Sequence, residues 1–239
     1  MKVFGLLMTY NCENLVDKAV SKIPISDLDK LICTDDGSSD NTVFRIKKKN
    51  IFVVENIHNG YGSNLFSGLS KAFEMGATHV IEIHGDGQYD YSKVVEMKKK
   101  FEAGADLVLG DRFYDYKQPL KDGMPWHIYI GNIVMSFTGR ILLGLPNNDL
   151  FPGFRGYSKK FFLEMKRIDL PQDYRFSFDI IVRSVYKKLK IFSTPVRCDY
   201  KGEHHTAPIK TALPIIINLI YTGLAYRLRW LGLKKELFK

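Results

Sequence analysis

The sequence has few cysteines and no hydrophobic run long enough to cross a membrane. Its three cysteines, Cys12, Cys33 and Cys198, are too few and too scattered for a disulfide framework or a thiolate metal site, so we expect a reducing compartment. The longest apolar stretch, residues 211–226, would reach about 24 Å as a helix, against roughly 30 Å for the hydrocarbon core of a bilayer. We therefore expect no spanning segment.

A glycine-rich loop is also absent after the first predicted strand. Residues 3–8 form an apolar run that is too short for the core of a signal peptide, and we interpret it as that strand. It leads into Thr9, Tyr10, Asn11 and Cys12, where a dinucleotide-binding protein would carry Gly-x-Gly-x-x-Gly. This disfavours a nicotinamide or flavin dehydrogenase. It also disfavours a nucleotidyltransferase, which would need a glycine-rich loop with a lysine at this place.

The chain does have enough hydrophobic residues for a buried core, and its charge is unevenly distributed. Of its 239 residues 45% are hydrophobic, which excludes a disordered or fibrous chain. Residues 1–150 hold 17 basic and 19 acidic side chains (net −2), whereas residues 151–239 hold 18 and 7 (net +11), which together give the +9 of the whole chain. An anionic or phosphate-rich partner would therefore meet the second half.

Short apolar runs alternate with longer amphipathic ones along the chain. This spacing predicts an α/β fold in which helices cover a mostly parallel sheet. The change of rhythm after the fifth strand predicts a polar loop at residues 115–125. The predicted strands are residues 3–8, 30–34, 51–54, 79–83, 107–109, 153–158 and 191–196, and the predicted helices are residues 13–22, 41–49, 63–75, 91–103, 126–143 and 176–189.

Polar residues gather where the predicted strands end, and in an open α/β sheet the ligand lies beyond the carboxyl ends of the strands. Two adjacent acids, Asp35 and Asp36, follow the second strand and precede a glycine turn. Ser39 and Asp40 suit a helix cap, but capping does not need the two acids before the turn. Such a pair can accept hydrogen bonds from a base N–H or from ribose hydroxyls. We favour a ligand site here over a cap alone.

Two further polar clusters follow the third and fourth strands. Gly60 and Gly62 precede a helix, and their backbone N–H groups could lie against a diphosphate, although a lone Gly-x-Gly is a weak signal. In residues 84–88, His-Gly-Asp-Gly-Gln, the Asp86 carboxylate and the Gln88 carbonyl are hard oxygen donors suited to Mg²⁺ or Mn²⁺. The alternative for this segment is a glycine turn closed by an Asx interaction.

Six short segments stand out along the chain: residues 9–14, 35–40, 59–62, 84–88, 110–113 and 153–158. In this order they resemble the motifs of family 2 glycosyltransferases with the GT-A fold. The similarity covers about residues 1–200 and is closest to the polyprenyl-phosphate mannose and glucose synthase branch. It implies a Rossmann-like, doubly wound GT-A fold in a single domain. It also implies inverting transfer of a hexose from a nucleotide-sugar, a UDP- or GDP-hexose.

On the donor side, the resemblance implies a nucleotide whose base lies on Asp36. Asp86 stands at the metal-binding acid of the family's Asp-x-Asp motif, and Gln88 follows it as in the lipid-phosphate branch. His84 replaces the first acid of that motif, and an imidazole can still bind Mn²⁺. The implied ligands of the nucleotide-sugar are Thr9, Tyr10, Glu13, Asp36, Gly60, Gly62 and Asp86, with Mn²⁺ or Mg²⁺ held by Asp86, Gln88 and His84.

On the acceptor side, the resemblance implies that Arg112 and Arg155 hold a phosphate, since guanidinium groups can bind its oxygens in bidentate fashion. Asp149 lies where relatives carry a catalytic base or a contact to a sugar hydroxyl. A phosphate acceptor is already ionised and needs no base, whereas a hydroxyl acceptor would use Asp149. His204 or His205 could add a metal or phosphate contact, and an exposed pair without a ligand role is the alternative.

We divide the chain into a GT-A catalytic domain, residues 1–205, and a basic amphipathic tail, residues 206–239. Residues 1–110 form the nucleotide-sugar half of the domain and residues 111–205 the acceptor half. The tail suits an interfacial helix on an anionic membrane, and the alternative is a helix that closes the core or forms a dimer seam in a homo-oligomer. We expect a cytoplasmic protein, peripheral on the cytoplasmic face of a membrane.

The leading functional hypothesis is a metal-dependent inverting glycosyltransferase that moves a hexose to a polyprenyl phosphate. The second is the same chemistry on a saccharide hydroxyl in surface polysaccharide or glycan synthesis. A hypothesis of another class is a non-catalytic basic module that binds membrane or nucleic acid, which would show salt-dependent binding without turnover of a nucleotide-sugar. The sequence has no nucleic-acid motif and no stacking aromatics interleaved with its basic residues, so we expect no nucleic-acid partner.

Overall fold

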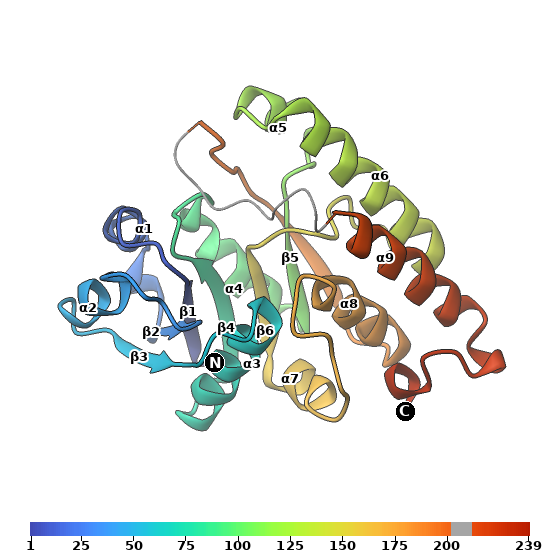
Figure 1. The fold of residues 1–239 in the computed structure, drawn as a ribbon, viewed down its shortest axis with the longest axis horizontal. Helices are drawn as coiled ribbons and strands as arrows, with labels where there is room; N and C mark the ends of the chain where they lie inside the picture. Colours follow the sequence, from blue (N-terminus) through green and yellow to red (C-terminus); the bar gives the residue numbers. More distant parts are fainter. Residues whose placement is uncertain (202–211) are drawn as a thin grey trace.

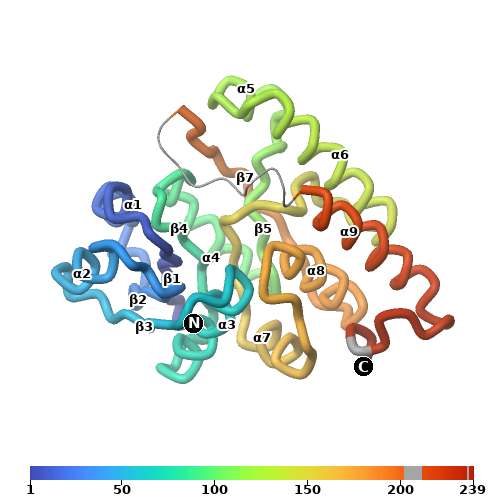
Figure 2. Tube along the Cα trace, in the orientation of Figure 1, coloured from blue at the N-terminus to red at the C-terminus, as the bar shows by residue number. Residues whose placement is uncertain are grey.

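A seven-stranded sheet runs through the part of the chain that the computed structural model describes, residues 1–201 and 212–239 (Figure 1, Figure 2). The strand order is β3-β2-β1-β4-β6-β5-β7, and β6 is antiparallel to its neighbours β4 and β5 while the other neighbouring pairs are parallel. The strands are β1 (Val3–Thr9), β2 (Lys30–Asp35), β3 (Phe52–Glu55), β4 (His79–His84), β5 (Leu107–Asp111), β6 (Arg155–Ser158) and β7 (Ile191–Pro195). The mostly parallel sheet is as predicted, and each strand ends within two residues of its predicted bounds.

Helices connect the strands and cover the sheet. Two of them, α5 and α7, were not predicted, because one or two helical turns are too short to show a helical period. The polar loop expected at residues 115–125 therefore contains a short helix. The helices are α1 (Val16–Ser21), α2 (Thr42–Lys47), α3 (Tyr61–Glu74), α4 (Val94–Glu102), α5 (Gln118–Lys121), α6 (Trp126–Leu143), α7 (Lys159–Met165), α8 (Phe176–Tyr186) and α9 (Ala212–Arg227).

The sheet has helices on both faces, as a doubly wound fold requires. Successive side chains of a strand point to opposite faces, so neighbouring residues of β1 enter different cores. Leu6 packs with buried residues of α3, α7 and α8, whereas Leu7 packs with buried residues of α1, α2 and α4. The predicted single α/β domain is confirmed.

The carboxyl ends of β1, β2 and β4 meet at one edge of the sheet because these neighbours are parallel. Thr9 at the end of β1 lies opposite Asp35 on β2, and Met8 lies opposite His84 on β4. The polar clusters that follow these strands are thereby brought to the same edge, where the candidate site lies.

α6 and α9 lie side by side next to α8 (Figure 1). Two glycines allow this close packing. A Cβ on Gly139 of α6 would lie 2.9 Å from a ring carbon of Phe178 on α8, and a Cβ on Gly223 of α9 would lie 2.5 Å from Leu142 on α6. Among the described residues, no helix is long and apolar enough to cross a membrane.

Candidate active site

A pocket of about 500 Å³ opens at the carboxyl ends of β1, β2 and β4. The two acids on which the sequence-based site depends, Asp36 and Asp86, both line it, although they follow different strands. The predicted site residues that the pocket brings together are Thr9, Tyr10, Asp36, Gly60, His84 and Asp86. The fold thus provides one cavity that contains most of the implied donor residues.

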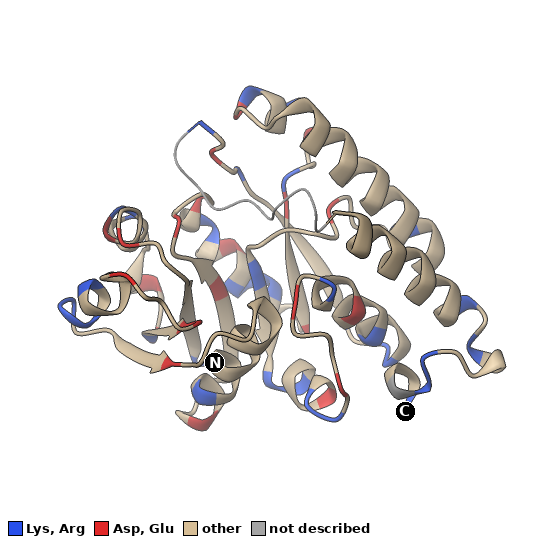
Figure 3. Cartoon of the chain, in the orientation of Figure 1, with Lys and Arg blue, Asp and Glu red and all other residues tan. Residues whose placement is uncertain are grey.

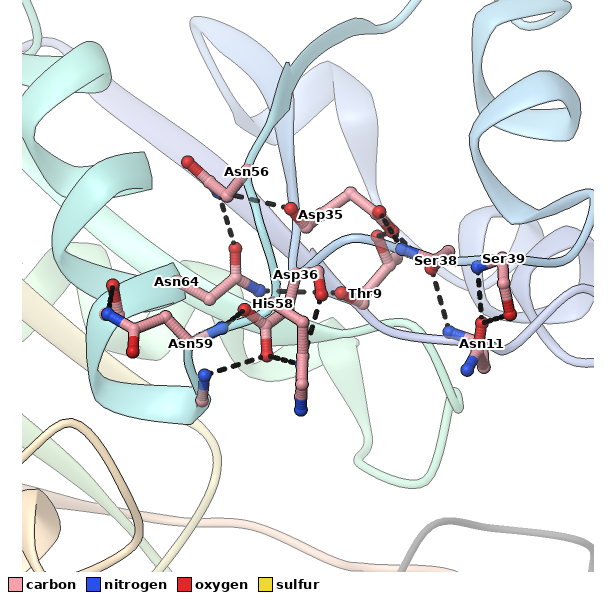
Figure 4. Close-up of polar contacts among 12 residues, drawn as sticks. Thr9, Asn11, Asp35, Asp36, Ser38, Ser39, Asn56, His58, Asn59 and Asn64 are labelled. Atoms are coloured by element: carbon pink, nitrogen blue, oxygen red, sulfur yellow. Dashed lines mark hydrogen bonds and ion pairs between the residues drawn. The ribbon is translucent and has the colours of Figure 1, made fainter.

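The two adjacent acids at the end of β2, Asp35 and Asp36, have different surroundings (Figure 4). Asp35 accepts hydrogen bonds from the hydroxyls of Thr9 (2.7 Å) and Ser38 (2.6 Å) and from the Ser38 backbone N–H, so it holds the turn in place. Asp36 lines the pocket and accepts from His58 Nδ1 (2.8 Å) and from the backbone N–H groups of Asn59 and Gly60. Asp36 therefore ties the glycine loop to the end of β2.

Two flat rings stack at the pocket. The phenol ring of Tyr10 lies 4.5 Å, centroid to centroid, from the imidazole of His58, with an angle of 13° between the planes. Both residues line the pocket, and Tyr10 is 44% exposed. Aromatic rings of this kind offer a stacking surface to a nucleobase, and Asp36 beside them offers an acceptor for base or ribose hydrogens. His58 was not among the predicted site residues, although its position just before the glycine loop was an available signal.

The glycine loop is packed against a later segment of the chain. The Gly62 N–H donates to the carbonyl of Gln172 at 2.7 Å, and a Cβ on Gly62 would lie 2.8 Å from the carbonyl oxygen of Pro171. Asp173 and Tyr174, which follow directly, line the pocket. Gly62 itself lines a separate cavity, so only Gly60 of the two predicted glycines borders the candidate donor pocket.

A buried carboxylate fixes the histidine that replaces the first acid of Asp-x-Asp. Glu82 is fully buried and accepts hydrogen bonds from Tyr61, Tyr157 and His84 Nε2, the last at 2.8 Å. Burial opposes protonation of His84, but the hydrogen bond and the negative charge of Glu82 outweigh it and raise the pKa of the imidazole. Nδ1 of His84 makes no hydrogen bond to a described residue. Glu82 was not among the predicted site residues.

The donor set for a divalent cation is only partly assembled. Asp86 and His84 line the pocket, and one Asp86 oxygen accepts from the Gln88 N–H in an Asx turn. Gln88 lines a different cavity, beside Lys121 and Arg197. Among the described residues, no group of three or more His, Cys, Asp and Glu side chains could hold a metal. Asp86 and His84 fit a cation that takes its other ligands from substrate phosphates, as Mg²⁺ commonly does.

The implied acceptor residues Arg112 and Asp149 form a buried ion pair. Nε of Arg112 lies 2.6 Å from Oδ2 of Asp149, and Nη2 lies 3.0 Å from Oδ1, so the contact is bidentate. The remaining guanidinium donors reach uncharged oxygens of Tyr200, Asn132 and Phe151. Neither Arg112 nor Asp149 lines the donor pocket.

Other predicted residues have structural surroundings. Arg155 is 1% exposed, and its guanidinium donates to the backbone carbonyls of Pro152, Leu150 and Ser177 rather than facing the pocket. Glu13 accepts from the N–H of Asn41 at the start of α2 and does not line the pocket. His204 and His205 lie outside the described residues.

These features define an α/β protein with a nucleotide-sized pocket at the carboxyl edge of its sheet. Residues 6–165 match the model of glycosyl transferase family 2, and the chain belongs to this family. It is 25% identical over 219 residues to a UDP-N-acetylglucosamine–dolichyl-phosphate N-acetylglucosaminyltransferase of Methanococcus voltae, which covers 83% of this chain and 86% of that protein. It is 22% identical to the polyprenol monophosphomannose synthase of Mycolicibacterium smegmatis, over 70% of this chain and 65% of that protein.

Solved structures show the same fold. Glucosyl-3-phosphoglycerate synthase of Mycobacterium tuberculosis in complex with UDP superposes with a TM-score of 0.69 at 17% identity, covering 94% of this chain and 79% of that one. The same enzyme in complex with Mn²⁺, UDP and glucosyl-3-phosphoglycerate gives a TM-score of 0.64. The fold is that of the GT-A glycosyltransferases, and the chain is a family 2 glycosyltransferase.

Proposed function

We propose that the protein transfers a hexose from a nucleotide-sugar to a polyprenyl phosphate, with inversion at the sugar carbon. The observation that carries the proposal is the single pocket that holds the Tyr10–His58 stack, Asp36 and Asp86. Stacking rings and a carboxylate suit a nucleoside, and a second carboxylate suits the cation that accompanies a diphosphate. One relative is named as an N-acetylglucosaminyltransferase that acts with dolichyl phosphate, and another as a polyprenol monophosphomannose synthase, which supports a lipid phosphate as the acceptor.

In this proposal the donor half comprises residues 1–110. The nucleobase stacks on Tyr10 and His58, and Asp36 accepts a hydrogen from the base or the ribose. Asp86 and His84, which both line the pocket, would hold Mn²⁺ or Mg²⁺, and the diphosphate oxygens would supply its further ligands. When bound, the cation supplies a Lewis acid that stabilises the negative charge of the leaving nucleoside diphosphate. Glu82 keeps the His84 ring in one orientation through its bond to Nε2.

The acceptor half, residues 111–205, would bind the lipid phosphate at Arg112. Asp149 binds Nε and Nη2 of this guanidinium. Other hydrogen bonds of Arg112 go to the uncharged oxygens of Tyr200 and Asn132, and an anionic phosphate can replace these partners. A phosphate is already ionised, so it attacks without a base. The bidentate pair with Arg112 makes Asp149 a positioning group, which favours the phosphate over the hydroxyl acceptor. Arg155 would act through the backbone of residues 150–152, whose carbonyls it binds.

The basic tail supports a peripheral contact with the cytoplasmic face of a membrane, where a lipid-linked acceptor would reside. The tail would then help to bind the lipid-linked acceptor.

A donor and acceptor screen tests the function. Nucleoside diphosphate release is measured for UDP- and GDP-hexoses with Mn²⁺ or Mg²⁺, in the presence of a short polyprenyl phosphate, the matching unphosphorylated polyprenol, or a free saccharide. We expect release and a glycolipid product only with the phosphate. Product from the saccharide alone would replace this proposal with the hydroxyl-acceptor hypothesis, and no release from any donor would contradict a transferase. Asp86→Asn should remove the metal dependence together with most of the rate.

A further inference from the structure

α6 exposes a row of large apolar side chains. The row comprises Trp126, Ile130, Val134, Phe137 and Ile141, each of them more than half exposed. Their spacing of three and four residues places them on one side of the helix, and the buried residues Ser136, Gly139 and Leu143 lie on the other. The surface helix of a soluble protein normally carries polar groups at such positions. This row is an apolar surface that the described part of the chain leaves uncovered.

α9, which lies beside α6, exposes a second row. Its large exposed side chains are Leu213, Ile216, Ile217, Ile220, Tyr221 and Leu224. The two helices are joined where Leu142 packs on Gly223 and where Arg227 donates to the carbonyl of Ile141. We call these two neighbouring rows the two-helix face. It is larger than the tail surface considered in the sequence, because α6 belongs to the catalytic domain.

The charge on the two-helix face has one sign. Neither α6 nor α9 contains an acidic residue, and Figure 3 shows no acidic position on either helix. Basic side chains stand at the end that the two helices share: Arg140 on α6, Arg227 at the end of α9, and Arg229 just after it. An apolar surface with a cationic border is complementary to an anionic lipid surface.

The only two tryptophans of the chain stand at the two ends of this face. Trp126 begins α6 and is 74% exposed, and Trp230 follows α9 and is 77% exposed. Eighteen residues of α6 extend about 27 Å, so an exposed indole stands at either end of the face. Indole rings with an apolar body and one N–H prefer the boundary between acyl chains and headgroups.

We propose that α6 and α9 together form a docking surface that lies flat on an anionic membrane, with both rows among the acyl chains. A second copy of this chain is a poorer occupant, because the same acid-free, cationic face would meet itself without a carboxylate to pair with Arg140, Arg227 or Arg229. The docking surface goes beyond the proposed function. Only the reason for docking, access to a lipid-linked acceptor, rests on that function.

Vesicle flotation of the full-length chain tests the docking surface. Wild-type protein should float with vesicles of phosphatidylcholine mixed with phosphatidylglycerol and should float poorly with pure phosphatidylcholine. Phe137→Ser on α6 should weaken binding about tenfold, since it removes one large apolar side chain from the lipid. Phe44→Ser is a matched control, because Phe44 on α2 is 57% exposed and Phe137 is 59% exposed, and it should bind as the wild type does.

Three results would overturn the proposal. If the Phe137→Ser and wild-type chains floated equally, α6 would not be part of the docking surface, even if Ile217→Ser on α9 weakened binding. A wild-type dimer in sedimentation that Phe137→Ser converts to a monomer, without vesicle binding by either, would assign the face to a second copy. Flotation that is indifferent to phosphatidylglycerol would remove the charge argument. Nucleoside diphosphate release with a short, water-soluble polyprenyl phosphate should be the same in Phe137→Ser and wild type, so a failure of the transferase assay would be recognised separately.

Discussion

Glu82 and His84 lie two residues apart on β4, and their side chains meet, with Nε2 of the imidazole 2.8 Å from Oε1 of the carboxylate. Alternate residues of a strand share a face, which is why the pair forms. Glu82 is completely buried, while His84 reaches the pocket. The strand thus presents to the donor site an imidazole whose orientation is set from beneath by a buried charge.

We predict that Glu82→Gln lowers the pKa of His84. The hydrogen bond to Glu82 and its negative charge raise the imidazole pKa in the wild type despite burial, so the ring should titrate above its usual value of about 6.5. The amide lacks the charge, and desolvation then dominates, so the variant should titrate below that value. Nitrogen-15 NMR of the histidine side chains across the pH range measures both.

The same variant should also lose affinity for Mn²⁺ in the presence of UDP, by about tenfold, because His84, the proposed ligand, would be less well oriented without its carboxylate partner. His79→Gln serves as a control, since His79 lies at the other end of β4 and does not line the pocket. Unchanged Mn²⁺ affinity in Glu82→Gln would limit Glu82 to a structural role.

We predict that His58 contributes to nucleotide binding through its ring rather than through its bond to Asp36. His58→Ala removes both the stack on Tyr10 and the hydrogen bond to Asp36, and should weaken UDP binding by about 1–3 kcal/mol. His58→Phe keeps a flat ring and removes only the hydrogen bond. In isothermal titration, the UDP affinity of His58→Phe should be close to that of the wild type. If it were instead as weak as that of His58→Ala, the hydrogen bond to Asp36 rather than the ring would account for the contribution of His58.

The elements with a strong hydrophobic pattern could be predicted from the sequence alone. Alternating apolar runs located the seven strands, and an eighteen-residue amphipathic pattern located α6 with its observed bounds. The short β6 was predicted as a strand, but its antiparallel insertion between β4 and β5 depends on contacts between distant residues that no local pattern encodes.

The site was predictable to the extent that it lies at strand ends. Asp36 and Asp86 reach one pocket because parallel strands end at the same edge. The orientation of Gln88 toward another cavity, the burial of Arg155 and the pairing of Arg112 with Asp149 depend on side-chain packing, which a motif does not specify. His58 and Glu82 were missed because each gains its role from a partner in space, Tyr10 in one case and His84 in the other.

We predict that Gly62→Ala separates the glycine loop from the segment that crosses it. The new Cβ would lie 2.8 Å from the Pro171 carbonyl and 3.1 Å from that of Gln172, both backbone atoms that must move. Alanine is otherwise the better helix former by about 1 kcal/mol, so a net loss of stability would measure the clash. Urea unfolding should show it, and limited proteolysis should cut more readily near Pro171. Gly131→Ala in α6 is the matched control: its Cβ meets nothing within 4 Å, so it should stabilise the protein slightly.

The buried pair of Arg112 and Asp149 gives the last prediction. Asp149 is 0% exposed, so Asp149→Asn leaves the guanidinium in the interior without its charged partner. The variant should lose about 3–5 kcal/mol of unfolding free energy, measured in urea, and its loss of activity would then reflect stability as well as chemistry. The double variant Arg112→Met, Asp149→Leu removes both charges and should recover much of that stability. It should remain inactive toward a polyprenyl phosphate, because it has lost the cation proposed to bind the acceptor. A double variant that folds and still transfers sugar to the lipid phosphate would refute the assignment of Arg112.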